Sequence, residues 1–169
     1  FRVAECWFPN YNAQEIERRS VYSVNGLSSD PFITMSGQYT TFKSNEGLPG
    51  ICLEKNEVIW WNDLIKNKAF KRRKILKESM IKTGLALPLE HRAKQVAVLT
   101  LFSEKNIDKS GIIIQHLAAL KETIGNGIAN KRKSLQRNIL NDSDATVVLN
   151  TAPDGTILKF NPTAAKMFV

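Results

Sequence analysis

Residues 84–105 constrain the fold of this chain more than any other stretch. They hold two apolar runs, separated by a short polar and charged tip. In the first run leucine occupies every second position, at Leu85, Leu87 and Leu89. The second run also alternates with a period of two, which is typical of half-buried strands. The sequence therefore predicts an antiparallel hairpin with strands at Leu85–Glu90 and Val96–Ser103.

Further elements follow from the spacing of apolar, proline and glycine residues. Three more strands are predicted, at Phe1–Phe8, Arg18–Val24 and Val58–Trp61. Helices are predicted at Pro31–Phe42, at Gly47–Glu54, at Phe70–Thr83 and from about Lys109. Pro49 is tolerated in a first helical turn, and Gly84 is typical of the position just after a helix.

The order of three segments resembles that of a GAF domain, a small sensory module of signalling proteins. They are Glu46–Gly50 (EGLPG), Val58–Leu64 (VIWWNDL) and the hairpin. The resemblance covers roughly residues 1–130. It implies an α+β fold with a central six-stranded antiparallel sheet flanked by helices, the first helix of the family lying before Phe1. Similar domains bind cyclic nucleotides, bilins, haem or amino acids, or no known ligand, and pass a signal along helices to an output domain.

The same resemblance implies a pocket for a small ligand between sheet and helices. Its candidate lining residues are Phe42, Cys52, Trp60, Phe70 and Leu87. Packing in an ordinary core is the alternative for each of them. The resemblance does not specify the cofactor: neither cysteine adjoins a histidine as in bilin-binding members, and the Asn-Lys-Phe-Asp-Glu signature of cyclic-nucleotide-binding members is missing. Two hypotheses therefore stay open, a ligand sensor and a ligand-free module for dimerisation and signal relay.

Catalysis finds little support in the sequence. Cys6 and Cys52 lack the spacing of metal ligands and are predicted to be reduced thiols. His91 lies at the hairpin tip and His116 in the long helix, so we expect no cysteine–histidine nucleophile pair. No phosphate-binding glycine loop of the P-loop or Rossmann type is present. We therefore expect no enzyme activity and no metal site, with any kinase or cyclic-dinucleotide output domain lying outside this chain.

The net charge of +8 is concentrated in one segment. Eight basic residues and one acid, Glu78, lie between Lys66 and Lys82. The pattern predicts a solvated helix face anchored by Leu76 and Met80, which could also attract an anionic ligand or a partner domain. Nucleic acid is not predicted as a partner, because no aromatic residues interleave with the cations. No apolar stretch approaches the roughly 20 residues of a membrane span, so a cytoplasmic domain is expected.

The long C-terminal helix carries an apolar stripe at steps of three and four residues. The stripe runs through Ile113, Leu117, Leu120, Ile124, Ile128, Leu135 and Ile139, and Lys131 interrupts it once. An eleven-residue repeat of this kind favours nearly straight helix pairs. A helix of about 30 residues is about 45 Å long and exceeds one small domain. We therefore predict a parallel homodimer through Ile113–Ile139, the alternative being one helix folded on its own sheet.

The last 30 residues resemble the beginning of a PAS domain. A strand at Ala145–Asn150, a turn at Pro153–Thr156 and a strand at Ile157–Phe160 precede Asn161 and Pro162, which are typical of a helix start. The predicted organisation is a GAF-like domain at residues 1–108, a linker helix at 109–142 and a PAS-like fragment at 143–169. This order suggests the sensory part of a prokaryotic signalling protein, such as a histidine kinase of a two-component system.

Overall fold

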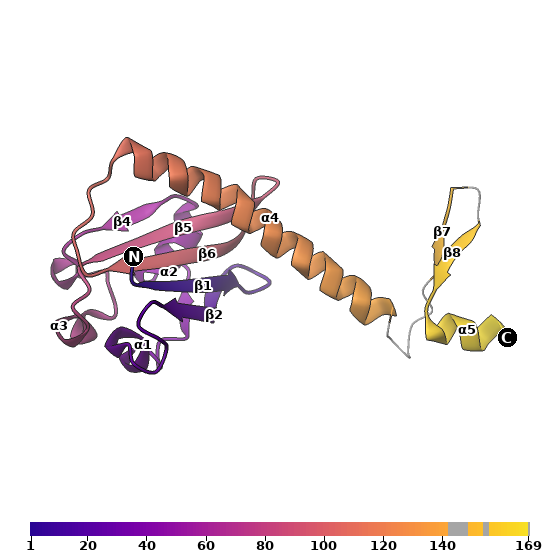
Figure 1. The fold of residues 1–169 in the computed structure, drawn as a ribbon, viewed down its shortest axis with the longest axis horizontal. Helices are drawn as coiled ribbons and strands as arrows, with labels where there is room; N and C mark the ends of the chain where they lie inside the picture. The colour runs from indigo at the N-terminus through magenta and orange to yellow at the C-terminus, as the bar shows by residue number, and fades with distance from the viewer. Residues whose placement is uncertain (142–148, 154–155, 169) are drawn as a thin grey trace. The chain divides into compact units, whose positions relative to one another are not determined.

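The computed structural model describes residues 1–141, 149–153 and 156–168 (Figure 1). The chain divides into two compact units, residues 1–126 and residues 127–169. The first unit is built on a six-stranded antiparallel sheet with the strand order β3-β2-β1-β6-β5-β4. Its strands are β1 (Val3–Pro9), β2 (Glu15–Ser23), β3 (Thr41–Lys43), β4 (Ile59–Trp61), β5 (Thr83–His91) and β6 (Lys94–Ser103). The α+β fold class predicted from the sequence is confirmed.

The β5–β6 hairpin is present as predicted and supplies two central strands. Leu87 pairs with Leu99, and Pro88 pairs with Val98. Because side chains alternate along a strand, each strand contributes to both faces of the sheet. Ala86 and Val98 belong to the main core, whereas Leu87 is fully buried on the opposite face. Burial on both faces explains why the sequence of this hairpin is apolar almost throughout.

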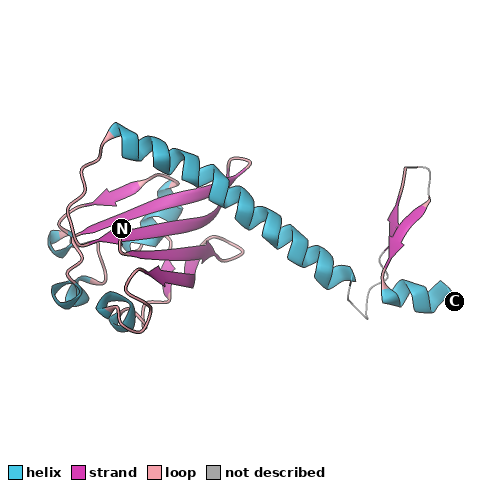
Figure 2. Ribbon diagram, viewed as in Figure 1, coloured by secondary structure: helices cyan, strands magenta, loops and turns pink. Residues whose placement is uncertain are grey.

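Short helices cover the face of the sheet that carries the main core (Figure 2). They are α1 (Pro31–Met35), α2 (Gly47–Lys55), the 3-10 turns η1 (Leu64–Lys66) and η2 (Arg73–Ile75), and α3 (Leu76–Ser79). Asp30 caps α1, and its side chain accepts a hydrogen bond from the backbone N–H of Phe32 over 2.9 Å. Helix α2 and strand β4 confirm the predictions for these segments.

Two predicted helices are wrong in extent. The helix predicted at Pro31–Phe42 ends at Met35, and Phe42 lies in the edge strand β3. The helix predicted at Phe70–Thr83 is replaced by η2 and the four-residue α3, which is capped by Met80 with a left-handed φ of 60°. The buried residues of this segment are Phe70, Arg72, Ile75, Leu76, Ser79, Ile81 and Thr83. Arg72, Ile75, Leu76 and Ser79 follow the helical spacing i, i+3, i+4 and i+7, but Phe70 and Ile81 would lie on the opposite face of a helix. The helical pattern therefore holds only for the middle of the segment.

Two details of the basic segment also differ from the prediction. Met80 is 60% exposed and does not anchor the segment, whereas Leu76 is buried as expected. Gly84 lies inside β5 and not after a helix. A Cβ atom there would lie 3.0 Å from Leu48 and 3.2 Å from Leu64. A glycine is therefore favoured because η1 and α2 pack closely over the strand.

The predicted long helix is present as α4 (Gly111–Asn141), and residues 111–126 of it pack against the β5–β6 hairpin (Figure 1). Lys121 Nζ lies 2.6 Å from Glu90 Oε1. Asn126 Oδ1 lies 2.6 Å from His91 Nδ1. A Cβ atom on Gly125 would lie 1.9 Å from the carbonyl oxygen of Glu90, so only glycine permits this approach of helix and strand.

The second unit contains a small hairpin and a helix. Strand β7 (Leu149–Thr151) pairs antiparallel with β8 (Ile157–Phe160). Helix α5 (Pro162–Phe168) begins as predicted, because Asn161 Oδ1 accepts a hydrogen bond of 3.0 Å from the N–H of Ala164. The predicted strand residues 145–148 and the turn residues 154–155 lie outside the described part of the chain. Among the described helices, none combines the length and the apolar character of a membrane span.

Candidate functional site

An arginine occupies the interior between the sheet and the short helices. Arg72 is 1% exposed, although it lies in the most basic segment of the chain. Its guanidinium carbon lies 4.8 Å from the ring centre of Phe32 and 4.9 Å from that of Phe102. Phe70 and Trp7 complete this aromatic box, with ring centres 5.6 Å and 5.9 Å away. Cations are attracted to aromatic rings at these distances, most strongly where water is excluded.

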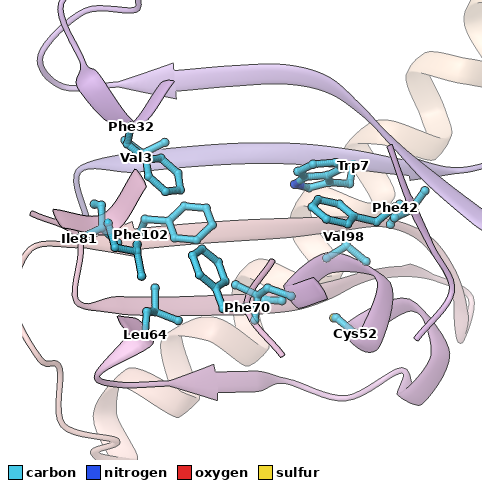
Figure 3. Close-up of a cluster of buried hydrophobic side chains, with 14 of the residues drawn as sticks. Val3, Trp7, Phe32, Phe42, Cys52, Leu64, Phe70, Ile81, Val98 and Phe102 are labelled. Atoms are coloured by element: carbon cyan, nitrogen blue, oxygen red, sulfur yellow. The ribbon is translucent and has the colours of Figure 1, made fainter. Parts of the chain in front are cut away.

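The four rings of the box also contact one another or neighbouring aromatics (Figure 3). The ring centres of Phe32 and Phe102 lie 4.7 Å apart, and those of Phe70 and Phe102 lie 6.2 Å apart. Trp7 packs against Phe42 with 5.4 Å between ring centres. The box therefore joins β1 and β6 of the sheet to α1 and to the loop before η2.

Glu5 is the counterion of Arg72. This glutamate lies on β1 with no exposed surface, and its two oxygens accept hydrogen bonds of 2.8 Å and 2.9 Å from the Arg72 guanidinium. Arg18, on β2, donates a second bond of 2.8 Å to Glu5 Oε1. Two cations thus surround one carboxylate. Such charge-assisted, bidentate contacts are the strongest hydrogen bonds available to side chains.

Uncharged groups complete the network around this ion cluster. The Thr100 hydroxyl, on β6, donates to Glu5 Oε2 over 3.1 Å and accepts from the Trp7 indole N–H over 3.0 Å. Arg18 also donates to the backbone carbonyl of Ser36, at the end of α1, over 3.3 Å. The buried charges therefore have hydrogen-bond partners from the sheet and from α1.

The cations decide the protonation state of Glu5. Burial by itself raises the pKa of this carboxyl, but the charges and hydrogen bonds of Arg72 and then of Arg18 outweigh burial and lower the pKa below its ordinary 4.5. The side chain is therefore an ionised carboxylate at neutral pH. A carboxylate whose oxygens are engaged in this way is suited to hold structure rather than to transfer protons.

The five predicted pocket residues divide between the two faces of the sheet. Phe42, Cys52 and Phe70 belong to the main core on the side of the short helices. Trp60 pairs with Leu85 across β4 and β5, which places it on the opposite face together with Leu87. Phe70 is one of the four rings of the aromatic box around Arg72. The predicted set does not form a single pocket lining.

Cys52 is buried in α2, and burial raises the pKa of its thiol to about 12. Lys121 acts in the opposite direction but does not compensate. The thiol donates a hydrogen bond to the carbonyl oxygen of Glu57 over 3.3 Å. A neutral buried thiol is a poor nucleophile. Among the described residues, no three His, Cys, Asp or Glu side chains gather as a metal site.

The predicted dimer stripe on α4 divides into buried and exposed residues. Leu117 is 5% exposed, and Ile113, Ile124 and Ile128 are half-buried. Leu120 and Leu135 are 41% and 49% exposed. The side chain of Ile139 lies outside the described part of the structure. Part of the stripe is therefore buried within the chain, and apolar surface remains at Leu120 and Leu135.

Comparison with solved structures places this architecture in a known fold. The GAF domain of a phosphoenolpyruvate-protein phosphotransferase from Coxiella burnetii superimposes with a TM-score of 0.62 at 17% identity, over 79% of this chain and 74% of that one. The GAF domain of a two-component sensor histidine kinase from Bacillus halodurans gives a TM-score of 0.59 at 18% identity, over 79% of this chain and 85% of that one. This chain has the fold of a GAF domain.

The GAF fold is not restricted to domains without catalysis. A type II free methionine-R-sulfoxide reductase from Thermoplasma acidophilum also superimposes, with a TM-score of 0.56 at 9% identity, over 75% of this chain and 77% of that one. No protein-family model and no curated relative matches the sequence. At these identities the comparisons support the fold that the sequence resemblance implied, and the role of the chain rests on its own residues.

Sequence reasoning missed the centre of this site, the pair Glu5 and Arg72. A signal for Glu5 was present, because Val3, Glu5 and Trp7 alternate along β1 and the first and last of them are core residues. An acid at an inward-facing position of a strand indicates either a buried cation beside it or a protonated carboxyl. For Arg72 the signal is its helical spacing from the apolar Ile75 and Leu76, three and four residues later, although the neighbouring cations Lys71 and Arg73 are exposed.

Proposed function

We propose that this chain is a regulatory domain of a signalling protein and relays a signal through a homodimer formed by α4. The single observation that carries the proposal is the length of this helix. Its 31 residues span about 46 Å, whereas the nine residues of β5 span about 30 Å. Strands of this length cannot cover the whole helix. Its apolar residues Leu120 and Leu135 are exposed and are available to a partner.

The side chains that occupy the interior favour relay without an interior ligand over the alternative of a pocket sensor. Sites for small molecules are usually preformed cavities lined by apolar side chains with a few polar groups. In this chain Arg72, Glu5 and four aromatic rings occupy the corresponding space. An interior ligand would have to displace an arginine whose removal leaves Glu5 with one cation fewer.

Within this chain the proposed role is regulatory and not catalytic. The high pKa of Cys52 opposes formation of the thiolate that nucleophilic catalysis by this residue would need. In our proposal, output belongs to a domain beyond residues 1–169, and the segment after Leu140 stays predicted as the beginning of a PAS domain. The two-component sensor histidine kinase of Bacillus halodurans is one signalling protein that contains a GAF domain.

Mass measurement by light scattering tests the dimer. At micromolar concentration we expect twice the chain mass of 19.0 kDa. Leu135→Asp should give the monomer mass with an unchanged circular dichroism spectrum. Ser134→Asp is the matched control, because it adds the same charge one position away at another exposed residue, and it should remain dimeric. A monomeric wild-type chain, or equal dissociation by both variants, would contradict the proposal.

A further inference from the structure

A basic cleft lies on the outer side of the segment that carries Arg72. The cleft has a volume of about 610 Å³, within the range of sites for small molecules. It is lined by Ile65, Lys68, Phe70, Lys71, Arg73, Lys74 and Lys77. Five cations thus surround a floor formed by two apolar residues. We name this feature the basic cleft.

The cations of the basic cleft are poorly neutralised by the protein. Lys71 Nζ lies 3.2 Å from Glu46 Oε1, which is the one ion pair found for these five side chains among the described residues. Glu78 is the only acid between Lys66 and Lys82. The five side chains are exposed, and bringing like charges together costs free energy unless an anion is bound.

We propose that the basic cleft binds a small molecule with several consecutive phosphates, such as a nucleoside triphosphate or inorganic tripolyphosphate. Four lysines and one arginine provide enough donors for a chain of phosphates. The concave shape suits a compact ligand better than a duplex. Phe70 is 1% exposed, so its ring offers little surface on which successive bases of a single strand could stack.

The position of the basic cleft connects such a ligand to the core. Lys71 and Arg73 point outward and line the cleft, while Arg72 between them is bound by Glu5 inside the aromatic box. A bound anion would neutralise the outward-facing cations Lys71 and Arg73. Arg72, in the same segment, packs into the core. The segment is therefore stabilised by the ligand, which raises the melting temperature of the whole domain. This binding requires neither the proposed dimer nor the relay.

Calorimetric titration with ATP and with sodium tripolyphosphate, at about 150 mM salt, tests the site. We expect saturable binding of both at one site per chain, with AMP much weaker because it carries a single phosphate. Lys74→Glu/Lys77→Glu should weaken binding at least about tenfold, since two charge-assisted contacts are lost and two repulsive charges are added. Lys94→Glu/Lys109→Glu is the matched control, because it makes the same change in net charge at exposed lysines outside the cleft. The control should bind within about threefold of wild type.

Three results would overturn the proposal. One is the absence of saturable binding of both ATP and tripolyphosphate up to about 1 mM. Another is equal weakening by the two double variants, which would indicate attraction by net charge alone. The third is tighter binding of a short oligothymidylate than of ATP, which would identify a surface for single-stranded nucleic acid. A melting temperature raised by tripolyphosphate in the control, but not in Lys74→Glu/Lys77→Glu, provides a second supporting measurement. Light scattering on the same samples reports the dimer separately.

Discussion

Replacing Arg72 with methionine tests whether the ion cluster holds the basic segment on the sheet. Methionine keeps most of the volume and makes favourable contacts with aromatic rings, so the change removes mainly the charge and the hydrogen bonds. Breaking a buried ion pair by removing one partner typically costs about 3–5 kcal/mol. Glu5 would retain Arg18 at 2.8 Å and Thr100 at 3.1 Å. The expected loss in the free energy of unfolding is therefore near the lower end, about 3 kcal/mol.

The partner substitution should cost more, because it affects two arginines. Glu5→Gln keeps the shape of the side chain but leaves Arg72 and Arg18 without a carboxylate, and their side chains are only 1% and 9% exposed. We expect a loss of about 5 kcal/mol. In the double variant Arg72→Met/Glu5→Gln the loss should fall short of the sum by about 2–3 kcal/mol, since the pair is then absent from both sides.

Urea unfolding followed by tryptophan fluorescence measures these changes, provided that the slope against denaturant is unchanged. Arg73→Met is the matched control: it is the same substitution at the next residue, which is exposed, and it should change the free energy of unfolding by less than about 0.5 kcal/mol. Equal effects of Arg72→Met and Arg73→Met would refute the role assigned to the cluster. Strict additivity in the double variant would also refute it.

Three further predictions concern Gly125, Cys52 and the pH dependence of the contribution of Glu5. Gly125→Ala should destabilise the protein by about 2 kcal/mol in urea unfolding, although alanine favours helix by about 1 kcal/mol, because its Cβ would lie 1.9 Å from the Glu90 oxygen. Gly127→Ala, with no described atom within 4 Å of the added Cβ, should instead stabilise it, and a gain in both variants would contradict the contact. Cys52, whose pKa is raised to about 12, should resist iodoacetamide at pH 8 until urea unfolds the chain, as peptide mass mapping would detect. Because the folded pKa of Glu5 is lowered, its contribution to stability is present above the unfolded value of 4.5 and is lost as pH falls through the folded pKa. The free energy of unfolding should therefore fall more steeply below pH 4.5 in the wild type than in Glu5→Gln, and parallel curves would count against this assignment.

The sheet could be predicted because its central strands are buried on both faces. Leu87 faces one side of the sheet and Ala86 the other. A run of apolar residues is what a strand buried on both faces requires. Strand β3 could not be predicted, because its three residues are too few for a period and Phe42 also fits a helical spacing from Phe32. Pairing with β2, a contact distant in sequence, decides between the two.

In the basic segment, the charge of a residue does not always predict that its side chain is exposed. Seven of its eight cations are exposed, as predicted, but Arg72 is buried against Glu5, 67 residues away in the sequence. The helical spacing of Arg72 from Ile75 and Leu76 indicates an inward position, but it does not identify a partner so distant. The spacing of their apolar neighbours could have placed both Glu5 and Arg72 in the interior, whereas the pairing of these two residues required the fold.

Glu90 provides a physical connection between the core of the first unit and the proposed relay helix. Its Oε1 atom accepts a hydrogen bond of 3.1 Å from Asn56, the residue that ends α2, and lies 2.6 Å from Lys121 of α4. Helix α4 approaches the backbone carbonyl of Glu90 closely, because Gly125 has no side chain at this point. Helix α2 packs on the same core cluster as Phe70, which neighbours Arg72 and lines the basic cleft. A displacement of the short helices would therefore change the contacts of Glu90, and Glu90 contacts α4 through Lys121. In a dimer joined through α4, both helices would receive this change together, which is the property that a relay requires.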